Sequence, residues 1–300
     1  MVLKPWPLLA RITTFYYKLN PDSFLSQGFF MLRIIHFVQN LSLDITIGAV
    51  ISSLFLARVM NVEVSAYMMI GLAIAIWLIY TFDHLRDAYK TKGRSNNPRH
   101  AFHQRYFKEV SSVALIVFAL GLYNLKYLPK ETIYLGLVLV GLSGLYFVYL
   151  MLAKKAISKE LFAATVYVAG IATAPLSLAE TVEAEWVILL LIFWILAYAN
   201  LLIIPSYEVE LDKSDNQSSV VTRLGELRVK RLLLFLLVLC TLLIQYFGYL
   251  TNLSAAYPIL ILMVSTLLIL VLRPQYFGKY QLYRILSDGI FFLPGIALLV

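Results

Sequence analysis

The chain has 300 residues, a length that would suit two soluble domains. Its composition excludes them: 61% of the residues are hydrophobic and only 14% are charged, whereas soluble domains carry about 25% charged residues. Mean hydropathy is +0.80. We therefore interpret the sequence as an all-α polytopic membrane protein. The net charge is +8. The basic residues that produce it lie between apolar segments, which favours a role in membrane topology over nucleic-acid binding.

Apolar runs along the chain predict nine transmembrane helices, because a helix of roughly 20 apolar residues crosses the hydrocarbon core. The longest run is divided by a turn at residues 251–254. The expected spans are about 41–60, 64–82, 110–126, 132–153, 161–179, 186–207, 232–250, 256–272 and 285–300. Residues 1–40 mix cations, prolines and aromatic residues and are typical of a cytoplasmic or interfacial segment. We treat residues 1–300 as one integral membrane domain.

The distribution of cations predicts the orientation. With the N-terminus in the cytoplasm, all of the 25 lysines and arginines lie inside except Arg58, Lys126 and Lys130. By the positive-inside rule, we expect a cytoplasmic N-terminus and an external C-terminus. A bacterial cytoplasmic membrane is the expected location, and no protein partner can be inferred from the sequence.

Two of the expected cytoplasmic loops begin with carboxylates four residues apart. These are Asp83 and Asp87 after the second helix, and Glu208 and Asp212 after the sixth. Residues at i and i+4 share one helical face. Two such pairs facing each other would supply oxygen ligands for Mg²⁺, which typically binds one or two carboxylates together with substrate phosphates.

Lysines and arginines accompany these acids at the mouth of an apolar bundle. Acids alone would indicate a cation site, whereas acids mixed with cations favour a metal–diphosphate headgroup with an apolar tail. The alternative interpretation is that the charges are solvated and only enforce topology, as most loop charges in membrane proteins do.

The two acidic segments resemble the two motifs of the UbiA superfamily of intramembrane prenyltransferases. The first is Asp83-x-x-x-Asp87, and the second runs from Glu208 through Asp212 to Arg223-Leu224-Gly225. The stretch from Tyr149 to Ser158 resembles the family's basic segment. This sequence departs from the family at Ile79 and Tyr80, where Asn-Asp is usual, which indicates a divergent branch.

The resemblance implies transfer of an isoprenyl chain from a prenyl diphosphate to a lipophilic acceptor, with Mg²⁺ assisting departure of the diphosphate. It leaves the acceptor and the chain length open. The implied metal ligands are Asp83, Asp87, Glu208 and Asp212. The residues implied to stabilise developing charge are Lys154, Lys155, Arg99 and Arg223. Those implied to bind the diphosphate are Lys90, Arg94, His100, Lys213 and Ser219.

Several alternatives accompany this hypothesis. A non-catalytic isoprenoid-binding protein of the same fold would suit the shortened first motif. A small-solute transporter would need polar groups near the membrane midplane. A zinc site at His84, His100 and His103 would want a further ligand with defined spacing. Asp44, inside the first expected span, is a candidate functional residue because ionisable groups in spans are costly.

Overall fold

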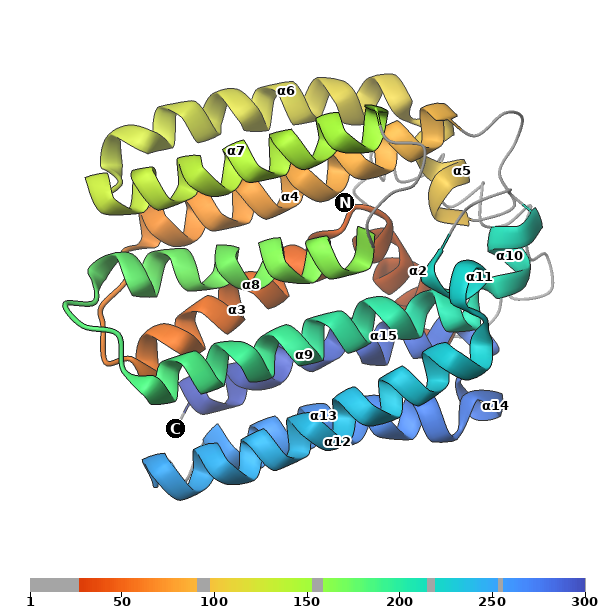
Figure 1. Ribbon diagram of the computed structural model, residues 1–300. Helices are drawn as coiled ribbons and strands as arrows, with labels where there is room; N and C mark the ends of the chain where they lie inside the picture. Colours follow the sequence, from red (N-terminus) through yellow and green to blue (C-terminus); the bar gives the residue numbers. More distant parts are fainter. Residues whose placement is uncertain (1–26, 91–97, 153–158, 215–218, 253–255, 300) are drawn as a thin grey trace.

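The computed structural model describes residues 27–90, 98–152, 159–214, 219–252 and 256–299, and these ranges contain helices and no strand (Figure 1). The α-helices are α2 (Gln27–Asn40), α3 (Leu43–Val59), α4 (Ala66–Lys90), α5 (Pro98–Arg105), α6 (Phe107–Asn124), α7 (Lys130–Leu152), α8 (Lys159–Leu178), α9 (Ala184–Tyr207), α10 (Val209–Ser214), α11 (Val220–Leu224), α12 (Glu226–Thr251), α13 (Ala256–Leu272), α14 (Pro274–Phe277) and α15 (Leu282–Gly289). The 3₁₀ segments are η2 (Leu125–Tyr127), η3 (Lys279–Gln281) and η4 (Ile290–Leu298).

Each of the nine segments expected to span the membrane is helical in the structure: α3, α4, α6, α7, α8, α9, α12, α13 and α15 with η4. Within the described ranges, α4, α6, α8, α9 and α12 are long and apolar enough to cross a membrane. A sixth span results if α2 and α3, which meet at a 78° bend, are taken as one. The chain is therefore an all-α membrane protein, while nine spans and the orientation of the termini stay predictions.

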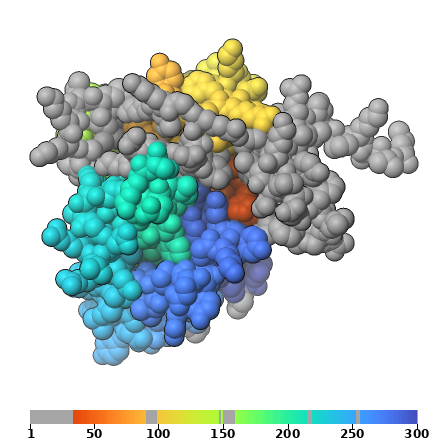
Figure 2. Space-filling model, turned by 90° about the vertical axis from the view of Figure 1, so that its right-hand side faces the viewer, coloured from red at the N-terminus to blue at the C-terminus, as the bar shows by residue number. Residues whose placement is uncertain are grey.

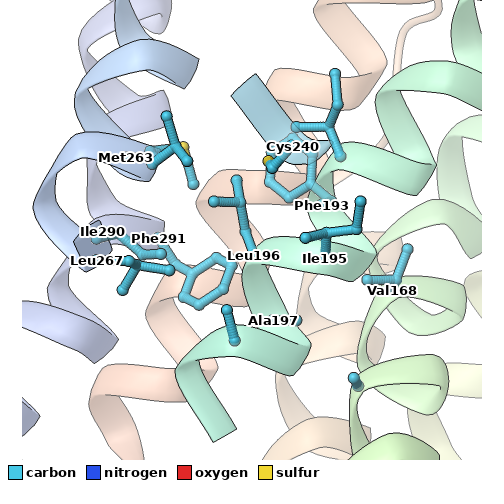
Figure 3. Close-up of a cluster of buried hydrophobic side chains, with 14 of the residues drawn as sticks. Val168, Phe193, Ile195, Leu196, Ala197, Cys240, Met263, Leu267, Ile290 and Phe291 are labelled. Atoms are coloured by element: carbon cyan, nitrogen blue, oxygen red, sulfur yellow. The ribbon is translucent and has the colours of Figure 1, made fainter. Parts of the chain in front are cut away.

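The core of the bundle forms around α9, which is apolar on all sides and packs against α8, α12, α13 and α15. A helix that is apolar on every side lies in a protein core or spans a membrane, and neighbouring helices bury most of α9. Figure 3 shows its side chains meeting those of α8, α12, α13 and η4. The labelled residues include Val168, Phe193, Leu196, Cys240, Met263 and Phe291.

The outer surface of the bundle is apolar as well. Leu115 of α6, Leu137 of α7 and Phe235 of α12 are 70%, 58% and 64% exposed. In water, a continuous apolar patch of this kind would drive association. On a polytopic protein, it is the surface expected to face lipid.

Two local features place polar side chains at one end of the bundle. The helix α4 continues beyond its apolar part as far as Lys90, so Asp83 and Asp87 remain helical. The start of α12 follows Gly225, whose φ of +87° lies in the region that favours glycine. This glycine lets the chain turn from α11 into α12.

Candidate functional site

The predicted site residues within the described ranges gather at one end of the bundle (Figure 1). This end holds the last turns of α4 and α9, the start of α8, and the short helices α5, α10 and α11. Figure 2 views the molecule from this side and shows α10 and α11, in teal, beside the blue segments that follow α13. The sequence placed these segments on one side of the membrane, and the structure brings them together.

The first acidic pair holds two cations. The Nζ atom of Lys159 lies 2.8 Å from Asp83 Oδ2 and 2.9 Å from Asp87 Oδ2. The Nη2 atom of Arg86 lies 3.1 Å from Asp83 Oδ1 and 3.0 Å from Asp87 Oδ1. The i, i+4 spacing therefore does place both carboxylates on one face of α4. Each of the four oxygens contacts a cation.

A small cavity of about 70 Å³ adjoins this pair between α4, α7 and α8. Asp83 and Lys159 form its polar boundary, and the rest of the lining is mostly apolar or aromatic. Further lining residues are Ile76, Ile79, Tyr80, Ser143, Tyr146, Phe162, Ala163, Val166 and Tyr167. The ring of Tyr146 stacks on Phe162, with centroids 3.6 Å apart. The site therefore joins paired charges to an apolar interior.

A larger cavity of about 490 Å³ lies on another face of α4, where Ala73, Ile74 and Trp77 contribute to it. Its other walls come from the start of α3 and from α2, α5 and α6, and its one charged lining residue is Glu109. Its volume lies within the range of small-molecule sites, about 300–1,000 Å³. The paired charges of Asp83 and Lys159, in contrast, border the smaller cavity.

The second acidic motif is built differently from the first. Glu208 Oε1 accepts hydrogen bonds from the Tyr283 hydroxyl, at 2.6 Å, and from the guanidinium of Arg284. The side chains of Glu208 and Arg284 are each 7% exposed. Tyr283 also stacks on Tyr207, with ring centroids 4.4 Å apart. This motif therefore ties the end of α9 to α15.

The remaining residues of this motif have diverse contacts. Asp212 is buried one turn after Glu208, and its backbone N–H donates to the Glu208 carbonyl. Lys213 lies in an exposed pair with Glu210 at 3.2 Å. Ser219 caps α11, where its side chain accepts from the Thr222 N–H. Asp212 is thus a buried acid on α10, at the same end of the bundle as the first acidic pair.

Arg223 and Glu160 join the second motif to α8. Arg223 Nη2 lies 3.8 Å from Glu160 Oε2, and Glu160 Oε1 accepts from the Val220 N–H at 3.0 Å. Because Glu160 directly follows Lys159, the N-terminus of α8 contacts both acidic motifs.

The helix α5 covers this end with Arg99 and two buried histidines, while Arg105 at its last position is exposed. Arg99 Nη2 donates to Ser42 Oγ at 2.8 Å. Burial lowers the pKa of Arg99, whereas the charges of Asp44 and Asp288 raise it. Burial lowers the pKa of His103 to about 4, so this ring is neutral near pH 7. Its Nδ1 lies 2.9 Å from the Arg99 carbonyl oxygen. In the tautomer protonated at Nδ1, this N–H donates a hydrogen bond to that oxygen.

Asp44 and Asp288 add two buried carboxyl groups near Arg99. Asp288 Oδ1 accepts from Asn200 Nδ2 at 2.9 Å. Asp44 is 7% exposed, and neither of its oxygens accepts a hydrogen bond from a side chain in the described part of the chain. Burying a carboxylate is costly. This observation therefore supports Asp44 as a candidate functional residue.

The structure does not assemble the four predicted metal ligands into one group. Within the described ranges, no three His, Cys, Asp or Glu side chains come close enough to hold a metal ion. The physical reason is that the Glu208 carboxylate binds Tyr283 and Arg284 of α15, and so does not join Asp83 and Asp87. The donor set of Asp83 and Asp87 does fit a divalent cation, because these carboxylates already share a cationic group.

Arg94, Lys154 and Lys155 lie outside the described residues. Lys90 is the last residue of α4. His100 is buried on α5, next to Arg99.

Sequence reasoning missed the parts played by Lys159, Tyr283, Arg284 and Asp288. Lys159 was expected only as one of several cations around the acids, without an assigned partner, and Arg284 only as a cation that sets membrane orientation. Asp288 carried a usable signal, because it is an ionisable residue inside the ninth expected span. The partners of Glu208 had none, since they lie 75 and 76 residues further along the chain.

Comparison with known proteins identifies the fold. No family model matches the sequence, and neither does any curated protein. A UbiA homologue from Archaeoglobus fulgidus, solved with DMAPP and Mg²⁺, superposes with a TM-score of 0.61 at 14% identity, over 88% of this chain and 99% of that one. The apo UbiA homologue from Aeropyrum pernix K1 gives 0.62 at 12% identity, over 86% and 98%.

A third similar structure is a digeranylgeranylglyceryl phosphate synthase, with a TM-score of 0.51 at 17% identity, over 85% of this chain and 90% of that one. The three likenesses extend over most of each chain. This chain therefore has the fold of the UbiA superfamily, and the resemblance stated from its acidic motifs is confirmed at that level.

Proposed function

We propose that this chain, with its UbiA fold, is a membrane prenyltransferase that moves an isoprenyl group from a prenyl diphosphate to a lipophilic acceptor. The observation that carries the proposal is the Asp83–Asp87 pair, which holds cationic groups at the boundary of an apolar cavity. A similar fold has been solved with DMAPP and Mg²⁺ bound. A bacterial cytoplasmic membrane remains the proposed location.

The diphosphate would bind at the Asp83–Asp87 pair. We propose that these two carboxylates hold Mg²⁺, with Asp212 as the contribution of the second motif. When bound, the ion would neutralise charge on the departing diphosphate as a Lewis acid. Glu208 would act indirectly, because its bonds to Tyr283 and Arg284 fix the end of α9, from which α10 and Asp212 follow.

Cations near the pair would bind the diphosphate oxygens. Arg86 and Lys159 are already at the acids, and Arg99 lies on the helix that covers this end. Arg223 is joined to the start of α8 through Glu160. Lys90, Arg94, Lys154, Lys155 and His100 stay proposals for the same role. Fixed positive charge where negative charge develops is often the largest catalytic contribution.

The prenyl tail would enter the cavity between α4, α7 and α8. At about 70 Å³ this space is smaller than a typical ligand site, so the lining must move apart when the tail binds. The stacked rings of Tyr146 and Phe162 lie in this lining. Aromatic faces attract cations, and an apolar surround keeps water away from an allylic cation.

The test uses purified protein in detergent with Mg²⁺, an allylic diphosphate and membrane lipid extracts as acceptors. We expect release of diphosphate together with formation of a prenylated lipid. Asp83→Asn and Asp87→Asn should each lower the rate by about 10²–10³. Glu183→Gln is the matched control and should keep full activity, because Glu183 is an exposed residue that caps the opposite end of α9. If no diphosphate is released with any lipid extract, the proposed prenyltransferase activity is rejected.

A second experiment tests the position of the tail. An allylic diphosphate with a photoreactive tail should label peptides that contain Tyr146 or Phe162. Labelling confined to the peptides of α5 and α6 would instead place the tail in the larger cavity, next to Phe102 and Tyr106.

A non-catalytic isoprenoid-binding protein of the same fold is the second candidate. One observation favours it: Ile79 and Tyr80 stand where two polar residues usually begin the first motif, and both line the small cavity. Such a protein would retain a prenyl diphosphate and release no diphosphate with any acceptor.

A further inference from the structure

Lys159 occupies the position that a shared metal ion would need. Its ammonium nitrogen is nearly equidistant from Asp83 Oδ2 and Asp87 Oδ2, at 2.8 and 2.9 Å. These are hydrogen-bonded ion contacts. Mg²⁺ binds oxygen at about 2.0–2.1 Å and demands near-ideal octahedral geometry. An ammonium group and a metal ion cannot both lie between the same two oxygens.

Lys159 and Arg86, the two cations that contact Asp83 and Asp87, differ in how easily they could move away from these acids. The side chain of Lys159 is 43% exposed, while that of Arg86 is 12% exposed. Lys159 is also the first residue of α8, and lysine is a compact charge on a flexible four-carbon stem. Arg86 lies on α4, between the two acids in the sequence. Lys159 is therefore the cation that can move away while the acids stay in place.

We infer that Lys159 is the resident counter-cation of the Asp83–Asp87 pair, and that a divalent ion binds there only by displacing its ammonium group. This inference rests on the proposed role of the pair as the diphosphate site. It adds a control on metal binding, because Lys159 and the metal ion compete for the same two oxygens.

Replacing the Lys159 ammonium group with a divalent ion changes the net charge of the cluster. With Lys159 and Arg86 in place, the two carboxylates are neutralised and the cluster has no net charge. A divalent ion in place of the ammonium group gives Asp83, Asp87, Arg86 and the metal a net charge of +1. The displaced Lys159 adds another positive charge beside it. The cluster then attracts a diphosphate, so metal and diphosphate should bind better together than either does alone.

The test measures metal binding directly. Mn²⁺ replaces Mg²⁺ as the probe, and free Mn²⁺ is followed by electron paramagnetic resonance in detergent without any diphosphate. Wild-type protein should bind Mn²⁺ weakly, and Lys159→Met should bind it about 10-fold tighter or more, as expected when a close opposite charge is removed. Lys230→Met, which removes an exposed charge at the start of α12, is the control and should change nothing.

Two results would overturn the inference. One is Mn²⁺ binding by a folded Lys159→Met variant that is no tighter than in wild type. The other is micromolar binding by wild-type protein alone, which needs no variant and so remains decisive if Lys159→Met fails to fold. Lys159→Gln provides a second, more conservative variant. Diphosphate release by wild type is measured separately, so failure of the proposed function is recognised independently of the Mn²⁺ result.

Discussion

Glu208 and Arg284 form a buried ion pair between the end of α9 and α15, and each side chain is only 7% exposed. The Tyr283 hydroxyl donates to the same carboxylate oxygen at 2.6 Å. A buried pair is favourable only when hydrogen bonds also satisfy its polar atoms. Here the pair connects the second acidic motif to the last helices of the chain.

The first prediction follows from this pair. Glu208→Ala leaves the Arg284 guanidinium buried without its carboxylate, and should lower the free energy of unfolding by about 3–5 kcal/mol. Tyr283→Phe removes one hydrogen bond to a charged acceptor and should cost about 1–3 kcal/mol. Thermal melts in detergent measure both. The control is Glu210→Gln, since the Glu210–Lys213 pair is exposed and should contribute less than about 1 kcal/mol.

The second prediction distinguishes the acids of the second motif by activity. Asp212→Asn keeps the size of the side chain but removes a charge proposed to act on the metal–diphosphate. Turnover should fall by about 10²–10³, and more than substrate affinity does, because the interaction strengthens as the leaving group departs. Glu210→Gln should lose less than about tenfold. Equal prenyl transfer by Asp212→Asn and wild type would remove Asp212 from the proposed site.

The third prediction concerns pH. Burial lowers the pKa of His103 to about 4, with the charges of Arg99 and His100 acting in the same direction and its bond to the Arg99 carbonyl opposing them. The unfolded chain, with a pKa near 6.5, therefore binds more protons between about pH 6.5 and pH 4. Stability should fall as the pH drops through that window, by at most about 1.4 kcal/mol per pH unit.

His103→Gln should flatten this part of the stability curve, because glutamine does not titrate. Melting temperatures measured from pH 7 to pH 4 in detergent provide the comparison. Parallel curves for variant and wild type would show that His103 is not the group responsible.

The fourth prediction concerns the turn that closes the second motif. Gly225 has a φ of +87°, and a Cβ atom added there would meet nothing within 4 Å. The cost of Gly225→Ala is therefore backbone strain alone, because φ of +87° with ψ of +147° is a region populated almost only by glycine, and it should be about 1–3 kcal/mol. Gly141→Ala also meets nothing within 4 Å, but it lies inside α7 and should stabilise by about 0.5–1 kcal/mol. Opposite shifts in melting temperature are the expected result.

The fifth prediction tests orientation. In a Cys240→Ala background, a cysteine at Ser214 should be protected from an impermeant thiol reagent in intact cells, whereas one at Thr181 should react. Both positions are exposed: Thr181 precedes α9, and Ser214 ends α10, which follows the other end of α9. The reverse pattern would place the acidic motifs outside the cell.

The sequence alone located the long apolar helices and predicted the helical face that Asp83 and Asp87 share. Asp83 and Asp87 share a face of α4 because i, i+4 geometry is local and requires no knowledge of the rest of the chain. The apolar runs located the helices for a similar reason, since the length of a run and its hydropathy are read directly from neighbouring residues. The sequence thus predicted which segments form the site and that they lie at the same end of the bundle.

Tertiary structure decided which charges meet. Lys159 reaches Asp87 across 72 residues, and Arg284 reaches Glu208 across 76. The sequence treated all four acids alike, yet Asp83 and Asp87 share the ammonium group of Lys159, and Glu208 is held in a buried ion pair. Partner choice depends on which helices pack together and how much water they exclude, and burial fixes the cost of leaving a charge unpaired. Spacing along the chain contains neither quantity.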